Sequence, residues 1–235
     1  MSIIKTDALV LKSIKYGDSS KIVSLFSKEL GKIKVILKSA RNYKSGLSGK
    51  FETLNYLTVI LYYRKNRDLQ NIYKAEFVRT FGNIVKEFSR LRAAYKIIEI
   101  LNKSLPDLDP NPKLYEIVLN FLSNLDLTES DSEILLLNFQ INFLKLAGLF
   151  PEFDIENGKI ETLKNLTEFN LSNEEIEFLS KITGQDFSNE SLKLARNNFD
   201  LEYISDRFSR FIVNNNATPV FFKSDKVFRE LKNGI

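Results

Sequence analysis

The first 80 residues alternate hydrophobic and polar positions with the period of two that is typical of β-strands. Turn signals rich in Gly, Asp, Ser and charged residues separate the alternating stretches. This pattern predicts five strands, at Ile4–Ile14, Lys21–Phe26, Lys32–Lys38, Thr53–Tyr63 and Leu69–Thr80. Five strands in so short a segment fit a small β-barrel.

At Phe81 the hydrophobic period changes to about 3.6, which predicts helices for the rest of the chain. The first helix ends before Pro106, with a buried stripe of Ile84, Phe88, Leu91, Tyr95, Ile98 and Leu101 and a polar face of Arg90, Arg92 and Lys96. Further helices are expected at Lys113–Asn124, Glu133–Ala147, Ser172 to about Lys181, between Ser188 and Val213 as one helix or two, and Ser224–Leu231. Capping-box spacing occurs at Ser130 with Glu133 and at Ser172 with Glu175.

The pattern therefore predicts a two-domain α+β protein. Residues 1–80 form a five-stranded β-barrel, and residues 81–235 form an all-α domain. An oligonucleotide-binding (OB) barrel has this strand count and size, and it binds nucleic acid on strands 2 and 3 and the flanking loops. The chain contains no internal repeat and no flexible linker, so we expect the two parts to pack directly on each other.

Charge is distributed unevenly between the two parts. Residues 1–80 contain 16 Lys/Arg and 6 Asp/Glu, a net charge of +10, whereas the other 155 residues contain 18 and 24, a net charge of −6. A basic first part favours a nucleic acid as its partner. The other interpretation is a scaffold whose basic module docks an acidic protein.

The third strand and the loop after it, Lys32 to Gly46, concentrate this charge. Between Glu29 and Glu52 there are six Lys/Arg and no acid. Lysine and arginine donate to phosphate oxygens, and an exposed ring beside Gly46 can stack on a base. The candidate DNA-contacting residues are Lys32, Lys34, Lys38, Arg41, Tyr43, Lys44 and Lys50, followed by the turn Arg64, Lys65 and Arg67. Of the adjacent Tyr62 and Tyr63, one is expected in the core, and Lys12 and Lys15 are assigned to the surface.

The chain has no Cys and no His. It therefore lacks disulfides, thiolate zinc sites, a cysteine nucleophile and the commonest general base. Asp126, Glu129, Asp131 and Glu133 form an acidic cluster, but acids are common where a helix begins. We therefore expect no enzyme and no cofactor, with a Mg²⁺-dependent nuclease as a distant alternative. No apolar run approaches a membrane span and no signal peptide is recognisable, which favours a cytoplasmic, nucleoid-associated protein.

Several segments resemble the bacterial recombination mediator family RecO. They are DALVLKSIKYGDSSKIVSLFSKELGKIKVILKSARNYKSG, AEFVRTF before the first helix, and LKLAGLFPEFD after the long one. The resemblance implies an OB-fold joined to a helical C-terminal domain, without enzymatic activity. It also implies binding to single- and double-stranded DNA, annealing of complementary strands, and cooperation with RecR and the C-terminal tail of the single-stranded DNA-binding protein to load RecA during DNA repair and recombination.

The sequence departs from one pattern of this family. Many relatives carry a four-cysteine zinc site after the Gly-Leu-Phe-Pro turn, whereas Pro151–Ile176 contains neither Cys nor His. A zinc site of that kind needs thiolate or imidazole ligands. Apolar packing is expected to replace it in residues 152–176, using Phe153, Ile155, Ile160, Leu163, Leu166 and Phe169.

Overall fold

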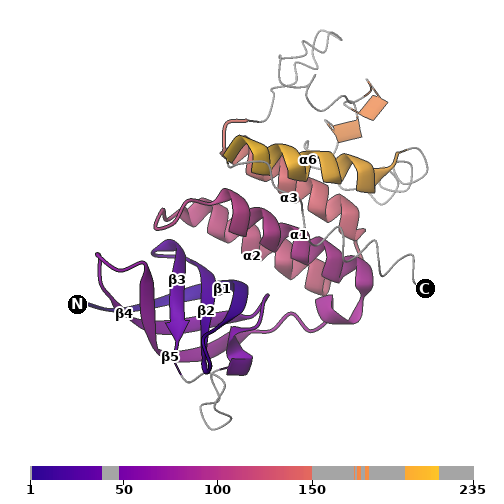
Figure 1. Ribbon diagram of the computed structural model, residues 1–235. Coiled ribbons are helices and arrows are strands. Elements are labelled where there is room, and N and C mark those ends of the chain that lie inside the picture. Colours follow the sequence, from indigo (N-terminus) through magenta and orange to yellow (C-terminus); the bar gives the residue numbers. More distant parts are fainter. Residues whose placement is uncertain are drawn as a thin grey trace.

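The computed structural model describes residues 2–38, 48–149, 172, 174, 175, 178, 179 and 199–216. Its strands are β1 (Ser2–Tyr16), β2 (Ser20–Ser27), β3 (Gly31–Leu37), β4 (Tyr56–Tyr63) and β5 (Leu69–Arg79). Its α-helices are α1 (Phe88–Ser104), α2 (Pro112–Leu127), α3 (Ser132–Leu146) and α6 (Leu201–Asn216), and 3₁₀ helices occur at Ser48–Phe51 and Ile84–Lys86. The strands precede the helices, as the α+β prediction requires (Figure 1).

The five strands close into a barrel in the order β1, β2, β3, β5, β4. Neighbouring strands are antiparallel except β3 and β5, which pair in parallel over Lys34–Ile36 and Leu69–Asn71. Because side chains alternate across a strand, every second residue enters the barrel. The interior is filled by Ala8, Val10, Val23, Leu25, Ile33, Val35, Leu37, Phe51, Leu57, Val59, Leu61 and Ala75.

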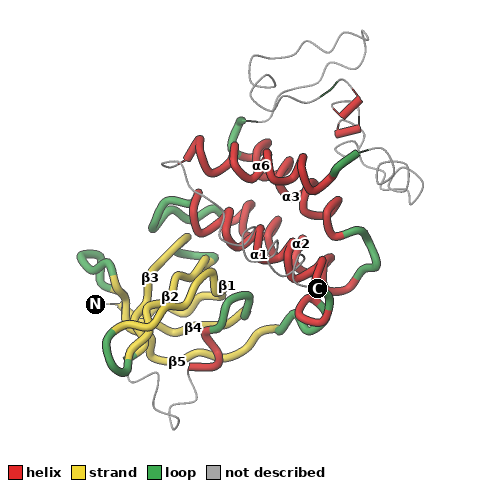
Figure 2. The backbone as a smooth tube through the Cα atoms, turned by 45° about the vertical axis from the view of Figure 1, so that its right-hand side comes forward, coloured by secondary structure: helices red, strands yellow, loops and turns green. Residues whose placement is uncertain are grey.

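At one end of the barrel the outward-facing residues are apolar and the helices cover them. Leu9 pairs with Phe26 of β2 on one side and with Tyr56 of β4 on the other. The Phe26 ring lies 5.3 Å from the ring of Tyr115 on α2. Figures 1 and 2 show α1 and α2 above the barrel, with α3 and α6 beyond them. A hydrophobic core that includes Leu9 and Phe26 therefore continues from the barrel into the helices.

The loop between α1 and α2 also contacts the barrel directly. Asp107 forms a parallel β-bridge with Lys32 of β3, and the Leu108 N–H donates to the Lys32 carbonyl at 2.8 Å. Gly31 has φ +69°, and a Cβ there would lie 2.2 Å from the backbone oxygen of Asp109. Glycine is therefore required where the loop crosses the start of β3.

The polar face predicted for the first helix is wrong. Arg92 and Lys96 point into the helical part, where their side chains are 12% and 0% exposed. Arg92 pairs with Glu133 of α3 and Glu202 of α6, and Lys96 pairs with Asp206 of α6. The predicted apolar stripe is shifted accordingly, since Ala93, Ala94 and Ile97 are buried while Phe88 and Tyr95 are 45% and 37% exposed.

Several predicted boundaries also move. The fourth strand begins at Tyr56 instead of Thr53, because the 3₁₀ helix and a left-handed Leu54 (φ 75°) precede it. The expected capping box at Ser130 does not form: Asp131 accepts the Glu133 N–H at 2.9 Å and caps α3. The capping box of Ser172 and Glu175 is confirmed by reciprocal bonds of 2.6 and 3.2 Å. The helix expected at Ser224–Leu231 lies outside the described residues, and so do the six apolar residues from Phe153 to Phe169 that are expected to pack in residues 152–176.

Candidate nucleic-acid interface

The outer faces of β1, β2 and β3 align their side chains in rows across the strands. Lys12 pairs with Ser24, and Ser24 pairs with Lys34. Lys12 and Lys34 are both exposed. The first row therefore presents two ammonium groups with a small hydroxyl between them. The sequence analysis assigned Lys12 only to the surface, but it lies on the same face as Lys34, a predicted DNA contact.

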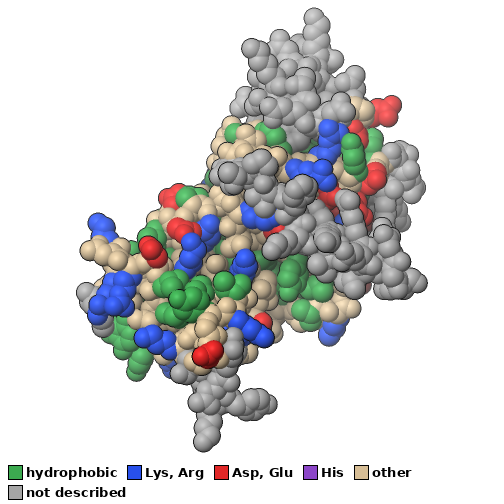
Figure 3. All heavy atoms as spheres, viewed as in Figure 1, with side chains coloured by type: hydrophobic (Ala, Val, Ile, Leu, Met, Phe, Trp, Pro, Cys, Tyr) green, Lys and Arg blue, Asp and Glu red, His purple; other side chains and the backbone are tan. Residues whose placement is uncertain are grey.

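The next row is apolar. Ile14 pairs with Ile22, and Ile22 pairs with Ile36, so three isoleucines lie side by side on the outside of the barrel. Ile14 is 45% exposed, and Tyr16 at the end of β1 is 53% exposed. In Figure 3 hydrophobic side chains lie among Lys and Arg side chains on the barrel face. The sequence analysis missed this row, although the alternation of β1 and β2 already placed Ile14 and Ile22 outside the core.

Lys32, a predicted DNA contact, is used inside the protein. Its ammonium group donates to the backbone carbonyls of Asn102, at 3.2 Å, and of Leu105, at the end of α1. It also forms an ion pair with Asp107 at 3.2 Å, and its side chain is only 12% exposed. A cation at a helix C-terminus stabilises the unpaired carbonyls there. Lys32 therefore links β3 to the end of α1, and its role in DNA binding stays a prediction.

Lys34 remains 46% exposed but is paired with Asp107 at 2.8 Å. Partial burial raises the pKa of Asp107, but hydrogen bonds from Lys34 and Lys32 outweigh it and hold the pKa below its ordinary value. Asp107 lies more than 70 residues from these lysines in sequence, so the local absence of acids did not reveal it. Lys38, just after β3, is exposed and forms no ion pair with a described residue.

The turn between β4 and β5 projects Arg64, Lys65 and Arg67, all of which are exposed. Gln70, a residue that is 2% exposed, supports this turn from the barrel side. Its oxygen accepts the Arg64 N–H at 2.9 Å, and its amide nitrogen donates to the carbonyls of Arg64 and Arg67 at 3.0 and 2.5 Å. One buried amide thus satisfies three backbone groups and fixes where three cations are displayed.

The remaining predicted contacts fall in or near the loop after β3. Lys50, in the 3₁₀ helix, donates to the Ala75 carbonyl at 2.8 Å and is half-buried. Arg41, Tyr43 and Lys44 lie outside the described residues. The described part of the chain therefore brings Lys34, Lys38 and the β4–β5 turn to the outside of the barrel.

Tyr62 and Tyr63 lie on opposite faces of β4, as strand alternation predicts. Tyr63 packs against the barrel core. Tyr62 faces outward, where its ring contacts that of Tyr73 on β5 edge-on, with centroids 5.5 Å apart. Tyr73 is 62% exposed.

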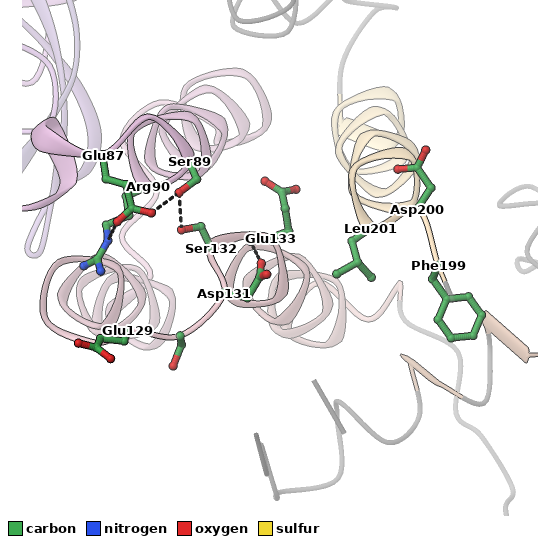
Figure 4. A pocket seen from close by; sticks show the side chains of 11 residues that line it. Glu87, Ser89, Arg90, Glu129, Asp131, Ser132, Glu133, Phe199, Asp200 and Leu201 are labelled. Atoms are coloured by element: carbon green, nitrogen blue, oxygen red, sulfur yellow. Dashed lines mark hydrogen bonds and ion pairs between the residues drawn. The ribbon is translucent and has the colours of Figure 1, made fainter. Parts of the chain in front are cut away.

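A pocket of about 330 Å³ lies where α1, α3 and α6 begin (Figure 4). Five carboxylates line it, from Glu87, Glu129, Asp131, Glu133 and Asp200, against one cation, Arg90. Ser89 donates to Glu87 at 2.6 Å and lies 3.4 Å from the hydroxyl of Ser132. Burial raises the pKa of Glu133, although the neighbouring Arg92 guanidinium lowers it. So acidic a lining repels phosphate, and this pocket is separate from the basic barrel face.

Structural roles account for most of the acidic cluster on which the nuclease alternative depends. Asp126 is buried and accepts the Asn83 and Ile84 N–H groups at 2.8 and 3.2 Å, and it pairs with Arg79 at 3.3 Å. Asp131 caps α3, and Glu133 pairs with Arg92. Within the described ranges, no three His, Cys, Asp or Glu side chains are grouped so that they could hold a metal ion.

Comparison with known proteins identifies the family. The model of the N-terminal part of recombination protein O matches residues 1–81, and the model of its C-terminal part matches residues 85–165. The chain belongs to the RecO family. The boundary between the two RecO models falls where the barrel gives way to the helices.

Named RecO proteins are also similar over the same region. DNA repair protein RecO of Chlorobium limicola is 36% identical over 152 residues, which are 65% of this chain and 58% of that protein. The RecO proteins of Salinibacter ruber and Chlorobium phaeobacteroides strain BS1 are 30% and 36% identical over 153 and 150 residues, covering 65% and 64% of this chain and 59% and 58% of theirs. The match thus spans less than two thirds of these relatives' length. None of the described helices combines the length and the apolarity that a membrane crossing requires.

Proposed function

We propose that this protein is a non-enzymatic DNA-binding mediator of DNA repair and recombination. Membership of the RecO family supports a repair and recombination role. The observation that carries the proposal is the outer barrel face, where Lys12, Lys34 and Lys38 surround the row Ile14, Ile22 and Ile36. Cations that track a phosphate backbone beside an apolar strip suit a single strand, whose bases are accessible.

We assign the barrel to the OB-fold, with residues 1–80 as the DNA-binding domain and residues 81–235 as the helical domain. The strand count and the closed order β1, β2, β3, β5, β4 support this assignment. In an OB-fold, strands 2 and 3 and the flanking loops bind nucleic acid. The proposed DNA-contacting set is Lys34, Lys38, Arg41, Tyr43, Lys44, Lys50, Arg64, Lys65 and Arg67, with Lys12 added from the same face and Lys32 in a structural role.

The chemistry proposed is strand annealing without a covalent step. Two complementary strands repel each other through their phosphates, and a fixed row of cations lowers that repulsion by displacing counterions. No nucleophile, metal or cofactor takes part in this process. The chain, which lacks Cys and His, offers none of the ligands of a four-cysteine zinc site.

The proposed partners are single- and double-stranded DNA, RecR, and the C-terminal tail of the single-stranded DNA-binding protein, with RecA loaded as a result. The unequal charge supports separate partners for the two parts, because the barrel carries the basic excess and the rest of the chain the acidic excess. The place of action we propose is the cytoplasm, at the nucleoid.

The decisive experiment is a titration of single-stranded DNA at several salt concentrations. If about five phosphates are neutralised, the logarithm of the binding constant should fall with the logarithm of salt with a slope of about −3 to −4. A slope near zero, or no binding at low salt, would contradict the proposal. The scaffold alternative predicts that an acidic protein partner binds the barrel face and that DNA does not. A competition experiment tests it, because a DNA oligomer should then fail to displace the partner.

A further inference from the structure

Tyr62 and Tyr73 form an aromatic pair on the outside of the barrel. Their ring centroids lie 5.5 Å apart at an interplanar angle of 65°. The register of β4 and β5 shifts between Ile60, which pairs with Lys74, and Leu61, which pairs with Ile72. Tyr73 is the extra residue at this bulge, and it is 62% exposed. A bulge turns a side chain out of the ordinary alternation, which explains why so large a ring lies in solvent.

The pair adjoins the outer barrel face that carries Lys12, Lys34 and Lys38. Asn71 of β5 pairs with Ile36 on one side and with Tyr62 on the other. The isoleucine row therefore continues across β5 to the aromatic pair. Since β3 and β5 are parallel, both strands run in the same direction from Ile36 and Asn71, toward Lys38 and Tyr73.

The surroundings of the pair are mainly basic. Lys5 of β1 pairs across the strands with Ile60, two residues before Tyr62, and the turn carrying Lys65 and Arg67 follows Tyr63. Two acids lie nearby: Glu76, which pairs with Lys74 at 2.7 Å, and Asp68 in the turn. Lys5, Lys65 and Arg67 form no ion pair with a described residue, so positive charge exceeds negative charge around the rings.

We propose that the Tyr62–Tyr73 pair is a stacking platform for the bases of single-stranded DNA, while the cations of β3 and of the β4–β5 turn hold its phosphates. This proposal rests on the proposed function, to which it adds base contacts at a defined place. Stacking on aromatic side chains tolerates any sequence, as annealing requires. A duplex hides its base faces, so the platform selects the single strand.

The experiment compares a thymine 20-mer with an abasic 20-mer, which carries the same phosphates without bases. Wild-type protein should bind the thymine oligomer at least about fivefold more tightly. Tyr73→Ala should weaken thymine binding about fivefold or more and leave abasic binding and its salt slope unchanged. Tyr203→Ala, which removes a ring that is 53% exposed on α6, is the matched control and should change neither.

A second variant distinguishes the loss of stacking from a fold defect. Tyr73→Trp keeps a stacking ring, so it should retain thymine binding, and because the chain has no Trp its fluorescence comes from that position alone. Stacking predicts quenching by the thymine oligomer and little by the abasic one. Equal affinity of the wild type for both oligomers, equal losses for both in Tyr73→Ala, or a Tyr73→Ala variant that binds DNA normally but loses a protein partner would each overturn the platform. Absence of any binding at low salt would instead overturn the proposed function.

Discussion

Lys96 of α1 and Asp206 of α6 form an ion pair in the interior of the helical part. The Lys96 side chain is 0% exposed and that of Asp206 is 7% exposed. Arg92, one turn earlier, pairs with Glu202 of α6 at 2.7 Å, and Gln140 of α3 donates to the Ser209 hydroxyl at 2.7 Å. Polar contacts thus fix how α6 lies on α1 and α3, in addition to apolar packing.

Replacing Lys96 by methionine should destabilise the protein strongly. The substitution leaves the Asp206 carboxylate in the interior without its ammonium partner, and removal of one member of a buried pair costs about 3–5 kcal/mol. The free energy of unfolding, measured by urea denaturation, should fall by about this amount. The double variant K96M/D206L should regain most of the loss, because the remaining buried charge is also removed.

The control for this prediction is Lys74→Ala. Lys74 and Glu76 form an ion pair on β5 whose side chains are 57% and 62% exposed. Such surface pairs contribute little to stability because solvent screens them. If Lys74→Ala and Lys96→Met changed the free energy of unfolding equally, the buried Lys96–Asp206 pair would be no more important to stability than an exposed pair.

The sequence predicted the barrel well because strand alternation is a local signal. Val23 and Leu25, two residues apart on β2, both enter the core, and their order along the chain is sufficient to predict this. Lys96 shows where such reasoning fails. A lysine on a helix is predicted to be exposed unless a partner is known, and its partner, Asp206, lies 110 residues further along the chain.

The candidate interface was likewise predictable only where it follows from strand alternation. The outward positions of Lys34 and Lys38 follow from the alternation of β3. The contacts of Lys32 do not follow from this alternation. Lys32 binds the carbonyls of Asn102 and Leu105, at a helix end that only the tertiary structure brings near β3. The bulge that exposes Tyr73 is likewise set by the pairing of two strands.

Gly31→Ala should destabilise the docking of the α1–α2 loop on the barrel. A Cβ at this position would lie 2.2 Å from the Asp109 backbone oxygen, and φ is +69°. The left-handed backbone alone costs about 1–2 kcal/mol for a non-glycine residue, and the collision adds to it. Gly17→Ala is the matched control, since Gly17 has φ +56° but nothing within 4 Å of the added atom. Denaturation should show a clearly larger loss for Gly31→Ala, and equal losses would contradict the close approach.

Asp107→Asn should strengthen binding to single-stranded DNA. The Asp107 carboxylate pairs with Lys34 at 2.8 Å, so its removal makes one more cation available on the proposed interface. The slope of the logarithm of the binding constant against the logarithm of salt should steepen by about 0.7. Asp109→Asn changes the net charge equally on the same loop, but Asp109 forms no ion pair with a described residue. If both variants steepened the slope alike, the effect would be one of overall charge and not of Lys34.

Asp107 should also contribute to the pH dependence of stability. Hydrogen bonds from Lys34 and Lys32 hold its pKa in the folded protein below the ordinary 3.8. The contribution is therefore present above pH 3.8 and is lost as the pH falls through the lower, folded-state pKa. Unfolding free energies measured from pH 5 downward should fall less steeply in Asp107→Asn than in the wild type. Parallel curves would show that the carboxylate is not stabilised by these lysines.

Gln70→Ala should weaken DNA binding only through the turn that Gln70 supports. The buried amide binds backbone groups of Arg64 and Arg67, so the substitution leaves those groups without partners and costs about 1–3 kcal/mol of stability. Where the turn contacts phosphate, its cations lose their fixed positions and the affinity for single-stranded DNA falls. The measurement is a double-mutant cycle with R64A/R67A.

The cycle distinguishes positioning from a general loss of fold. If Gln70 acts by placing the turn, adding Gln70→Ala to R64A/R67A should cause no further loss of DNA affinity, although the free energy of unfolding still falls. Additive losses of affinity would mean that Gln70 supports another part of the interface. The same R64A/R67A variant, set against R41A/K44A, decides between the two loops: the loop that contacts DNA is the one whose substitution weakens binding and flattens the salt dependence.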